Sequence, residues 1–162
     1  MHLLICGQSF VSSLSLRSDL HGFCNLPPDW IVRFDGRLGA TISSFLVQPP
    51  VLEPMPDVIY FVIGENDIGH CRPADILSRF ICLCGSLGHL GVPCVILGSL
   101  LPRFCPCGLS VSQYGRAARF LNRELPQVLP TSNFVVFWKV RGLFRSAYIA
   151  NDGVHLTSMG ER

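Results

Sequence analysis

Lysine and long apolar runs are scarce in this sequence. Only one of the 13 basic residues, Lys139, is a lysine, and charged residues make up 15% of the 162-residue chain. The basic residues are scattered and the net charge is only +2, so no basic stripe of the kind that binds nucleic acid is present. The apolar runs, such as Val58–Ile63, are far shorter than the roughly 18 residues of a membrane span. The sequence therefore indicates neither direct nucleic-acid binding nor a transmembrane segment.

The cysteines lack the C-x₂-C spacing that is typical of zinc sites. Four of the eight form two C-x-C pairs, Cys82/Cys84 and Cys105/Cys107. These pairs could in principle assemble a ligand set with His89, but the favoured interpretation is that the thiols are reduced and buried as small hydrophobic groups. The first residues also lack the basic region of a secretory signal. We therefore expect no metal, and an intracellular location, in the cytoplasm.

Glycine-rich loops that bind phosphate are also missing. No G-x-G-x-x-G opens a predicted helix, and there is no G-x₄-G-K-[ST] motif. The nucleophile motif G-x-S-x-G of the α/β-hydrolases fails because Val11 stands where its second glycine belongs. No nucleotide or other organic cofactor is expected, and a flavodoxin-like cofactor binder is disfavoured.

Short apolar runs alternate with segments of helical period, the pattern of β-α-β units. The helical segments are predicted around Leu77–Leu87 behind Pro73 and around Tyr114–Leu125 behind a cap at Ser110 or Ser112. Weaker helical patterns cover Phe10–Leu20 and Ala40–Val47. The predicted strands are His2–Cys6, Trp30–Phe34, Val58–Ile63, Cys94–Leu97 and Phe134–Trp138. With 49% hydrophobic residues, this predicts one α/β domain over residues 1–162, a three-layer α/β/α sandwich with about five parallel strands.

Polar, glycine-containing segments follow four of the predicted strands. Because ligands bind beyond the carboxyl ends of parallel strands, these segments are the candidate site. They contain a serine, an aspartate and a histidine in the order Ser9, Asp152 and His155. A serine nucleophile needs a base that a third group orients, and a tight turn at D-G-V-H can bring the carboxylate of Asp152 to the imidazole. The alternative is that D-G is an ordinary turn and His155 a surface residue.

These segments, in this order, resemble the four blocks of the SGNH (GDSL-type) hydrolases. G-Q-S at 7–9 resembles the block that carries the nucleophile, Ser9, and Gly39 resembles the glycine of the second block. G-E-N-D at 64–67 resembles the third block, with its asparagine at Asn66, and D-G-V-H-L at 152–156 the last. The resemblance implies the flavodoxin-like SGNH fold, the triad Ser9, Asp152 and His155, and an oxyanion hole formed by Ser9, Gly39 and Asn66.

The first block departs from the family at Gln8, where the family usually has aspartate. Ser9 itself is retained, which indicates changed support for the nucleophile. The chain also ends at Arg162, where the family usually continues into a closing helix, so we expect a domain cut from a longer protein. A narrower likeness is to the esterase-like domains of LINE-type retrotransposon first open-reading-frame proteins.

The resemblance implies a serine ester hydrolase of the carboxylesterase or acetylesterase type, without metal or cofactor. Its substrate would be a small ester, such as an acylated sugar or lipid, and its partners would be other domains of a parent protein. The alternative is a weakly active or inactive esterase-shaped module that binds or assembles within a retroelement or scaffold protein.

Overall fold

Five parallel strands form a single sheet in the computed structural model, which describes residues 1–16, 26–106, 108–129, 134–140 and 150–154. The order across the sheet is β2-β1-β3-β4-β5, and every neighbouring pair is parallel. The strands are β1 (His2–Gly7), β2 (Ile31–Gly36), β3 (Val58–Val62), β4 (Val95–Gly98) and β5 (Val135–Trp138). The predicted number of strands and their direction are confirmed, and each predicted end lies within two residues of the observed one.

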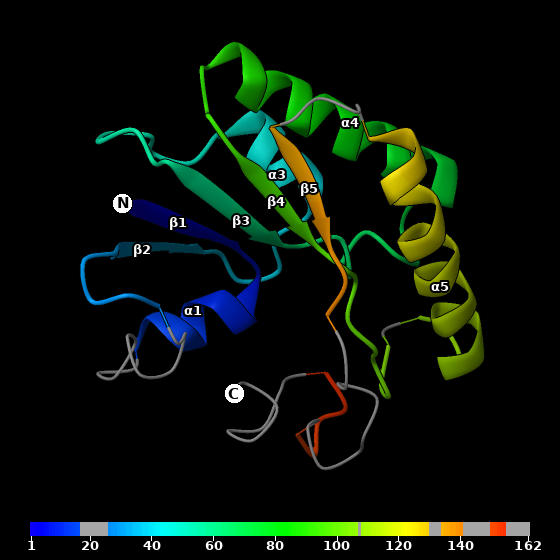
Figure 1. Cartoon of the computed structure of the whole chain (residues 1–162). Helices are drawn as coiled ribbons and strands as arrows, with labels where there is room; N and C mark the ends of the chain where they lie inside the picture. Colours follow the sequence, from blue (N-terminus) through cyan, green and yellow to red (C-terminus); the bar gives the residue numbers. More distant parts are fainter. Residues whose placement is uncertain (17–25, 107, 130–133, 141–149, 155–162) are drawn as a thin grey trace.

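Helices cover both faces of the sheet, which confirms the predicted three layers (Figure 1). One face packs against α1 (Ser9–Ser15), and the other packs against α3 (Ile42–Val47), α4 (Pro73–His89) and α5 (Val111–Val128). The helix predicted over Phe10–Leu20 begins at Ser9 and ends at Ser15, and Leu20 lies outside the described residues. None of the described helices is long and apolar enough to span a membrane.

Local sequence signals explain where the longer helices begin. Ser110 caps α5 by a reciprocal pair of hydrogen bonds with Gln113, so the first of the two candidate cap residues is the one used. Pro73 is the first residue of α4, where the missing N–H of proline does no harm. Thr41 and Ser44 form the same reciprocal cap at the start of α3. That cap fixes the loop between β2 and α3, which belongs to the candidate site.

The core lies on both faces of the sheet, as a continuous apolar pattern in parallel strands predicts. In β1, Leu3 and Ile5 pack on the α1 side, whereas Leu4 and Cys6 pack toward the other helices. The predicted burial of the cysteines is right for two of them and wrong for two others. Cys6 and Cys84 are buried, but Cys82 and Cys105 are exposed. Cys82 and Cys84 are two residues apart on α4, so Cys84 lies on the buried face of the helix and Cys82 on the exposed one.

Candidate active site

The loops that follow β1, β2, β3 and β4 meet at the carboxyl edge of the sheet, where ligands bind in open α/β folds (Figure 1). Hydrogen bonds join these loops to one another. Arg37 N donates to Gly7 O at 2.9 Å, which ties the end of β1 to the loop after β2. Asn66 after β3 and Leu101 after β4 also reach neighbouring loops. The site is thus assembled from all four of these connections.

Ser9 is the first residue of α1, and only Gln8 separates it from the end of β1. The helix lies tightly against the end of β2, because a Cβ at Gly36 would overlap the backbone of Ser12. Only glycine allows this approach at position 36. The close contact fixes the start of α1, and with it the half-buried Ser9, at the edge of the sheet.

Ser9 lines a small hollow of about 10 Å³, which we call the serine hollow. Its lining residues are Gln8, Ser9, Phe10, Glu65, Leu101, Pro102, Arg103 and Val154. The volume is about that of one water molecule. Val154 comes from the opposite end of the chain, so the structure brings the first and last candidate segments to the same place.

A tight turn carries Asp152 and ends at Val154. Asp152 Oδ1 accepts a hydrogen bond from Val154 N at 2.9 Å, and Gly153 N donates to Ala150 O at 2.9 Å. Gly153 O accepts from Phe104 N at 2.7 Å, which fixes the turn to the loop after β4. The turn that the D-G pair predicts is therefore present. His155, the next residue, lies outside the described residues.

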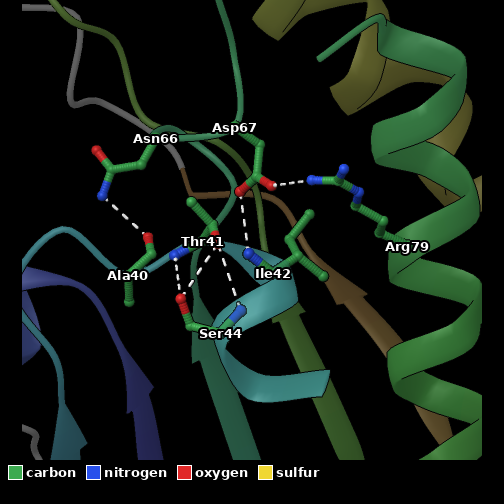
Figure 2. A network of polar contacts seen from close by, with 7 residues as sticks. All are labelled: Ala40, Thr41, Ile42, Ser44, Asn66, Asp67 and Arg79. Atoms are coloured by element: carbon green, nitrogen blue, oxygen red, sulfur yellow. Dashed lines mark hydrogen bonds and ion pairs between the residues drawn. The ribbon is translucent and has the colours of Figure 1, made fainter. Parts of the chain in front are cut away.

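Gly39 and Asn66 line a second cavity, of about 270 Å³, which we call the amide cavity. Its lining residues are Gly39, Thr41, Glu65, Asn66, Ile68, His70, Arg103, Pro106 and Tyr114. Asn66 Nδ2 donates one hydrogen to Ala40 O at 2.9 Å (Figure 2). An amide nitrogen carries two hydrogens. The second has no partner among the described residues and is available to a ligand.

Asp67 joins the loop after β3 to two helices (Figure 2). Its Oδ2 accepts from Ile42 N, at the start of α3, at 3.0 Å, and its Oδ1 pairs with Arg79 of α4 at 3.2 Å. Burial raises the pKa of Asp67, and the hydrogen bonds from Ile42 and Arg79 act in the opposite direction. Asp67 thus fixes the loop that carries Asn66 to the start of α3, directly after the loop that carries Gly39 and Ala40.

A second, partly buried network of hydrogen bonds connects the two hollows and was not predicted from the sequence. Gln8 Nε2 donates to Glu65 Oε2 at 3.0 Å, and Glu65 Oε1 accepts from Leu101 N at 2.8 Å. Arg103 Nη2 donates to Gln8 Oε1 and to Asn66 Oδ1, each at 2.8 Å. Burial raises the pKa of Glu65, more than its backbone hydrogen bonds and Arg103 lower it. Arg103 therefore links the residue beside Ser9 to the candidate oxyanion donor.

The predicted residues fall into two groups that meet at Glu65 and Arg103. Ser9 and the turn from Asp152 to Val154 belong to the serine hollow, whereas Gly39 and Asn66 belong to the amide cavity. The missed residue Arg103 follows β4, a strand after which the sequence motifs predict no site residue. The general rule about carboxyl ends of strands would have found it. Among the described residues, no three His, Cys, Asp or Glu side chains are grouped so that they could hold a metal ion.

No protein-family model and no curated protein matches this sequence, but solved structures do. A Bacteroides fragilis protein described as an acylhydrolase is 24% identical with a TM-score of 0.72, over 98% of this chain and 80% of that one. A carbohydrate esterase of family 3 from Talaromyces cellulolyticus is 17% identical with a TM-score of 0.70, over 99% and 90%. A Desulfitobacterium hafniense protein, described as lipolytic and of the G-D-S-L family, is 12% identical with a TM-score of 0.63, over 96% and 83%.

These likenesses cover nearly the whole chain and define its fold. The parallel sheet with helices on both faces is that of the GDSL-type (SGNH) hydrolases, as the sequence resemblance implies. The chain therefore has the SGNH hydrolase fold.

Proposed function

We propose that the chain is a serine ester hydrolase that works through an acyl-enzyme. The observation that carries the proposal is that Ser9 and Val154 line one hollow. His155 is the residue that follows Val154 in the sequence. The SGNH fold, shared with proteins described as acylhydrolases and esterases, supports the same activity.

In this mechanism Ser9 Oγ attacks the carbonyl carbon of an ester, and His155 takes the hydroxyl proton. Asp152 orients the imidazole and stabilises its charged form. The tetrahedral intermediate expels the alcohol, which receives the proton from His155. Water then attacks the acyl-serine with His155 again as the base, and the carboxylic acid leaves.

The negative oxygen of each intermediate needs donors fixed in advance. We assign this role to the backbone N–H groups of Ser9 and Gly39 and to the second hydrogen of Asn66 Nδ2. The first hydrogen of that amide is held by Ala40 O, and its oxygen by Arg103, which supports a fixed orientation. One such donor typically contributes 10²–10³ in rate.

A second candidate is an esterase-shaped binding or assembly module without hydrolytic activity. The small volume of the serine hollow favours it, since about 10 Å³ does not admit an ester group without some opening. In the hydrolase, the ester would lie in the larger amide cavity and reach Ser9 past Arg103.

A fluorophosphonate probe tests the proposal, because it labels only an activated serine and needs no knowledge of the true substrate. Mass spectrometry should find the adduct on Ser9, and Ser9→Ala should remove it. Ser15→Ala, on the exposed side of the same helix, is the matched control and should label like the wild type. The labelling rate should rise with pH through one ionisation, which the carboxylate of Asp152 shifts upward from the ordinary histidine pKa of about 6.5. His155→Ala should abolish this rise, and Asp152→Asn should slow labelling. Equal labelling of Ser9 in the wild type, His155→Ala and Asp152→Asn would leave only the binding module.

A further inference from the structure

The guanidinium of Arg103 lies at the boundary between the serine hollow and the amide cavity. The residue lines both, and it comes from the loop that follows β4. Its Nη2 donates to Gln8 Oε1 and to Asn66 Oδ1, each at 2.8 Å. These two bonds fix the guanidinium between Gln8, the residue before the nucleophile, and Asn66, the proposed oxyanion donor.

Most of the donors of this guanidinium remain available. Arginine carries five N–H groups, and the two bonds from Nη2 leave those on Nε and Nη1. Neither atom has a hydrogen-bond partner among the described residues, and no described carboxylate lies within 4.0 Å of Arg103. In the part of the chain that the structure describes, the charge is held in place by the neutral side chains of Gln8 and Asn66 and forms no ion pair.

Glu65 is the acidic side chain that shares both hollows with Arg103, but its oxygens are used elsewhere. One accepts from Leu101 N and the other from Gln8 Nε2. Burial also raises the pKa of Glu65, more than Arg103 lowers it. Because both oxygens of Glu65 accept from other donors, this carboxylate leaves Nε and Nη1 of Arg103 available to a ligand.

We propose that Arg103 is the receptor for an anionic group, a carboxylate or a phosphate, on the substrate of the proposed esterase. The inference rests on the proposed function. An ester oxygen bound at Asn66 would lie close to a guanidinium that is itself 2.8 Å from Asn66 Oδ1. A negative group next to the ester would then receive charge-assisted hydrogen bonds from Nε or Nη1. The volume of about 270 Å³ suits a small compound, such as a short acyl ester of a hydroxy acid or of a small phosphate-bearing alcohol.

Matched ester pairs that differ in charge test this inference. One pair is O-acetyl-lactate and O-acetyl-lactamide, and the other is acetylglycerol phosphate and acetylglycerol. In the wild type, kcat/KM should be at least about tenfold higher for the anionic member of one pair, the range for a hydrogen bond to a charged group. The pair with the larger ratio identifies the anionic group. The ratio is independent of the folded fraction, so a variant that is partly unfolded still reports on Arg103.

Variants at Arg103 and at a control arginine complete the experiment. Arg103→Gln should reduce the ratio to about one, whereas Arg103→Lys should retain part of it because the charge remains. Arg116→Gln, on the exposed side of α5, should keep the wild-type ratio. Equal rates for both members of each wild-type pair would overturn the inference and leave the esterase intact, as would a preference that persists in Arg103→Gln. Absence of any hydrolysis together with absence of Ser9 labelling would overturn the proposed function and this inference with it.

Discussion

The side-chain amide of Gln8 donates from Nε2 to Oε2 of Glu65 at 3.0 Å, and both side chains are buried. The family that the chain resembles usually has aspartate at position 8. A carboxylate there cannot donate to Glu65 when both acids are ionised, and two buried carboxylates in contact repel each other. Gln8 is neutral and supplies the donor that Glu65 requires. Gln8, where the family usually has aspartate, is therefore complementary to Glu65, the acidic residue that follows β3.

Gln8→Glu should destabilise the protein in a pH-dependent way. The substitution keeps the shape of the side chain but exchanges the Nε2 donor for an oxygen that faces Glu65. At pH 5 the two acids can share a proton, whereas at pH 8 their repulsion should make the loss of stability larger. The new carboxylate keeps the hydrogen bond from Arg103 Nη2 and gains an ion pair there, which offsets part of the loss, so we expect about 1–3 kcal/mol. Urea unfolding at the two pH values measures the difference.

The double variant Gln8→Glu with Glu65→Gln is the control, because it reverses donor and acceptor across the same contact. It should recover most of the stability at pH 8. A single variant as stable at pH 8 as at pH 5 would mean that the two side chains do not meet in the folded protein.

The wild type should lose stability as pH rises above the unfolded pKa of Glu65. Burial raises the pKa of Glu65 above its unfolded value, so the folded state holds this proton more tightly. That stability is present below the unfolded pKa, about 4.3, and is lost as pH rises through the folded pKa. The loss is about 1.4 kcal/mol for each pH unit that separates the two pKa values. Glu65→Gln should reduce the change of the free energy of unfolding with pH, measured by urea unfolding at each pH. Glu53→Gln, at an exposed position, should leave that change as it is in the wild type. The same pH dependence in all three proteins would mean that Glu65 is not its source.

The sheet could be predicted because its signal is local. Val58–Ile63 is a continuous run of β-branched and aromatic residues, and β3 occupies all but its last residue. Such a run has no polar face. It therefore predicts a central strand whose two faces are both covered by helices. The short α1 was harder to delimit, since tertiary packing at Gly36, not helical period, holds its seven residues.

The site was only partly predictable from the sequence. The serine of G-Q-S and the turn of D-G-V were recognised by motif, and Ser9 and Val154 do share a hollow. The partnership of Gln8, Glu65 and Arg103 has no such motif, because it depends on which side chains meet between three loops. Residues 8 and 103 are separated by 95 positions, and no spacing rule connects them.

Asn66→Asp should separate a structural role of Asn66 from a catalytic one. The aspartate keeps an oxygen for Arg103 Nη2 but has no hydrogen for Ala40 O or for an oxyanion. We expect the probe-labelling rate to fall by about 10² or more, the loss typical of one oxyanion donor. The ion pair with Arg103 should offset part of the stability lost at Ala40.

Asn66→Ala is the comparison, since it removes both hydrogen bonds and should be the less stable of the two. Labelling per folded molecule, with the folded fraction taken from urea unfolding, distinguishes the roles. A labelling rate in Asn66→Asp equal to that of the wild type would remove Asn66 from the oxyanion hole.

Gly153→Ala should impair the proposed base, His155, by distorting the turn that precedes it in the sequence, without changing His155 itself. Gly153 has φ +69°, a left-handed conformation that disfavours side chains, and a Cβ there would come within 2.8 Å of Cys105 N. Cys105 N and Phe104 N both donate to Gly153 O, so the turn cannot move away without losing these hydrogen bonds. We expect a loss of about 1–3 kcal/mol in stability and slower labelling of Ser9 in the fraction that remains folded.

Gly85→Ala, on α4, is the control. A Cβ at this position meets nothing within 4 Å, so the variant should stabilise the helix by up to about 1 kcal/mol and leave labelling unchanged. If Gly153→Ala labels as fast as the wild type per folded molecule, the turn does not position the base, and the assignment of Asp152 and His155 to the triad fails with it.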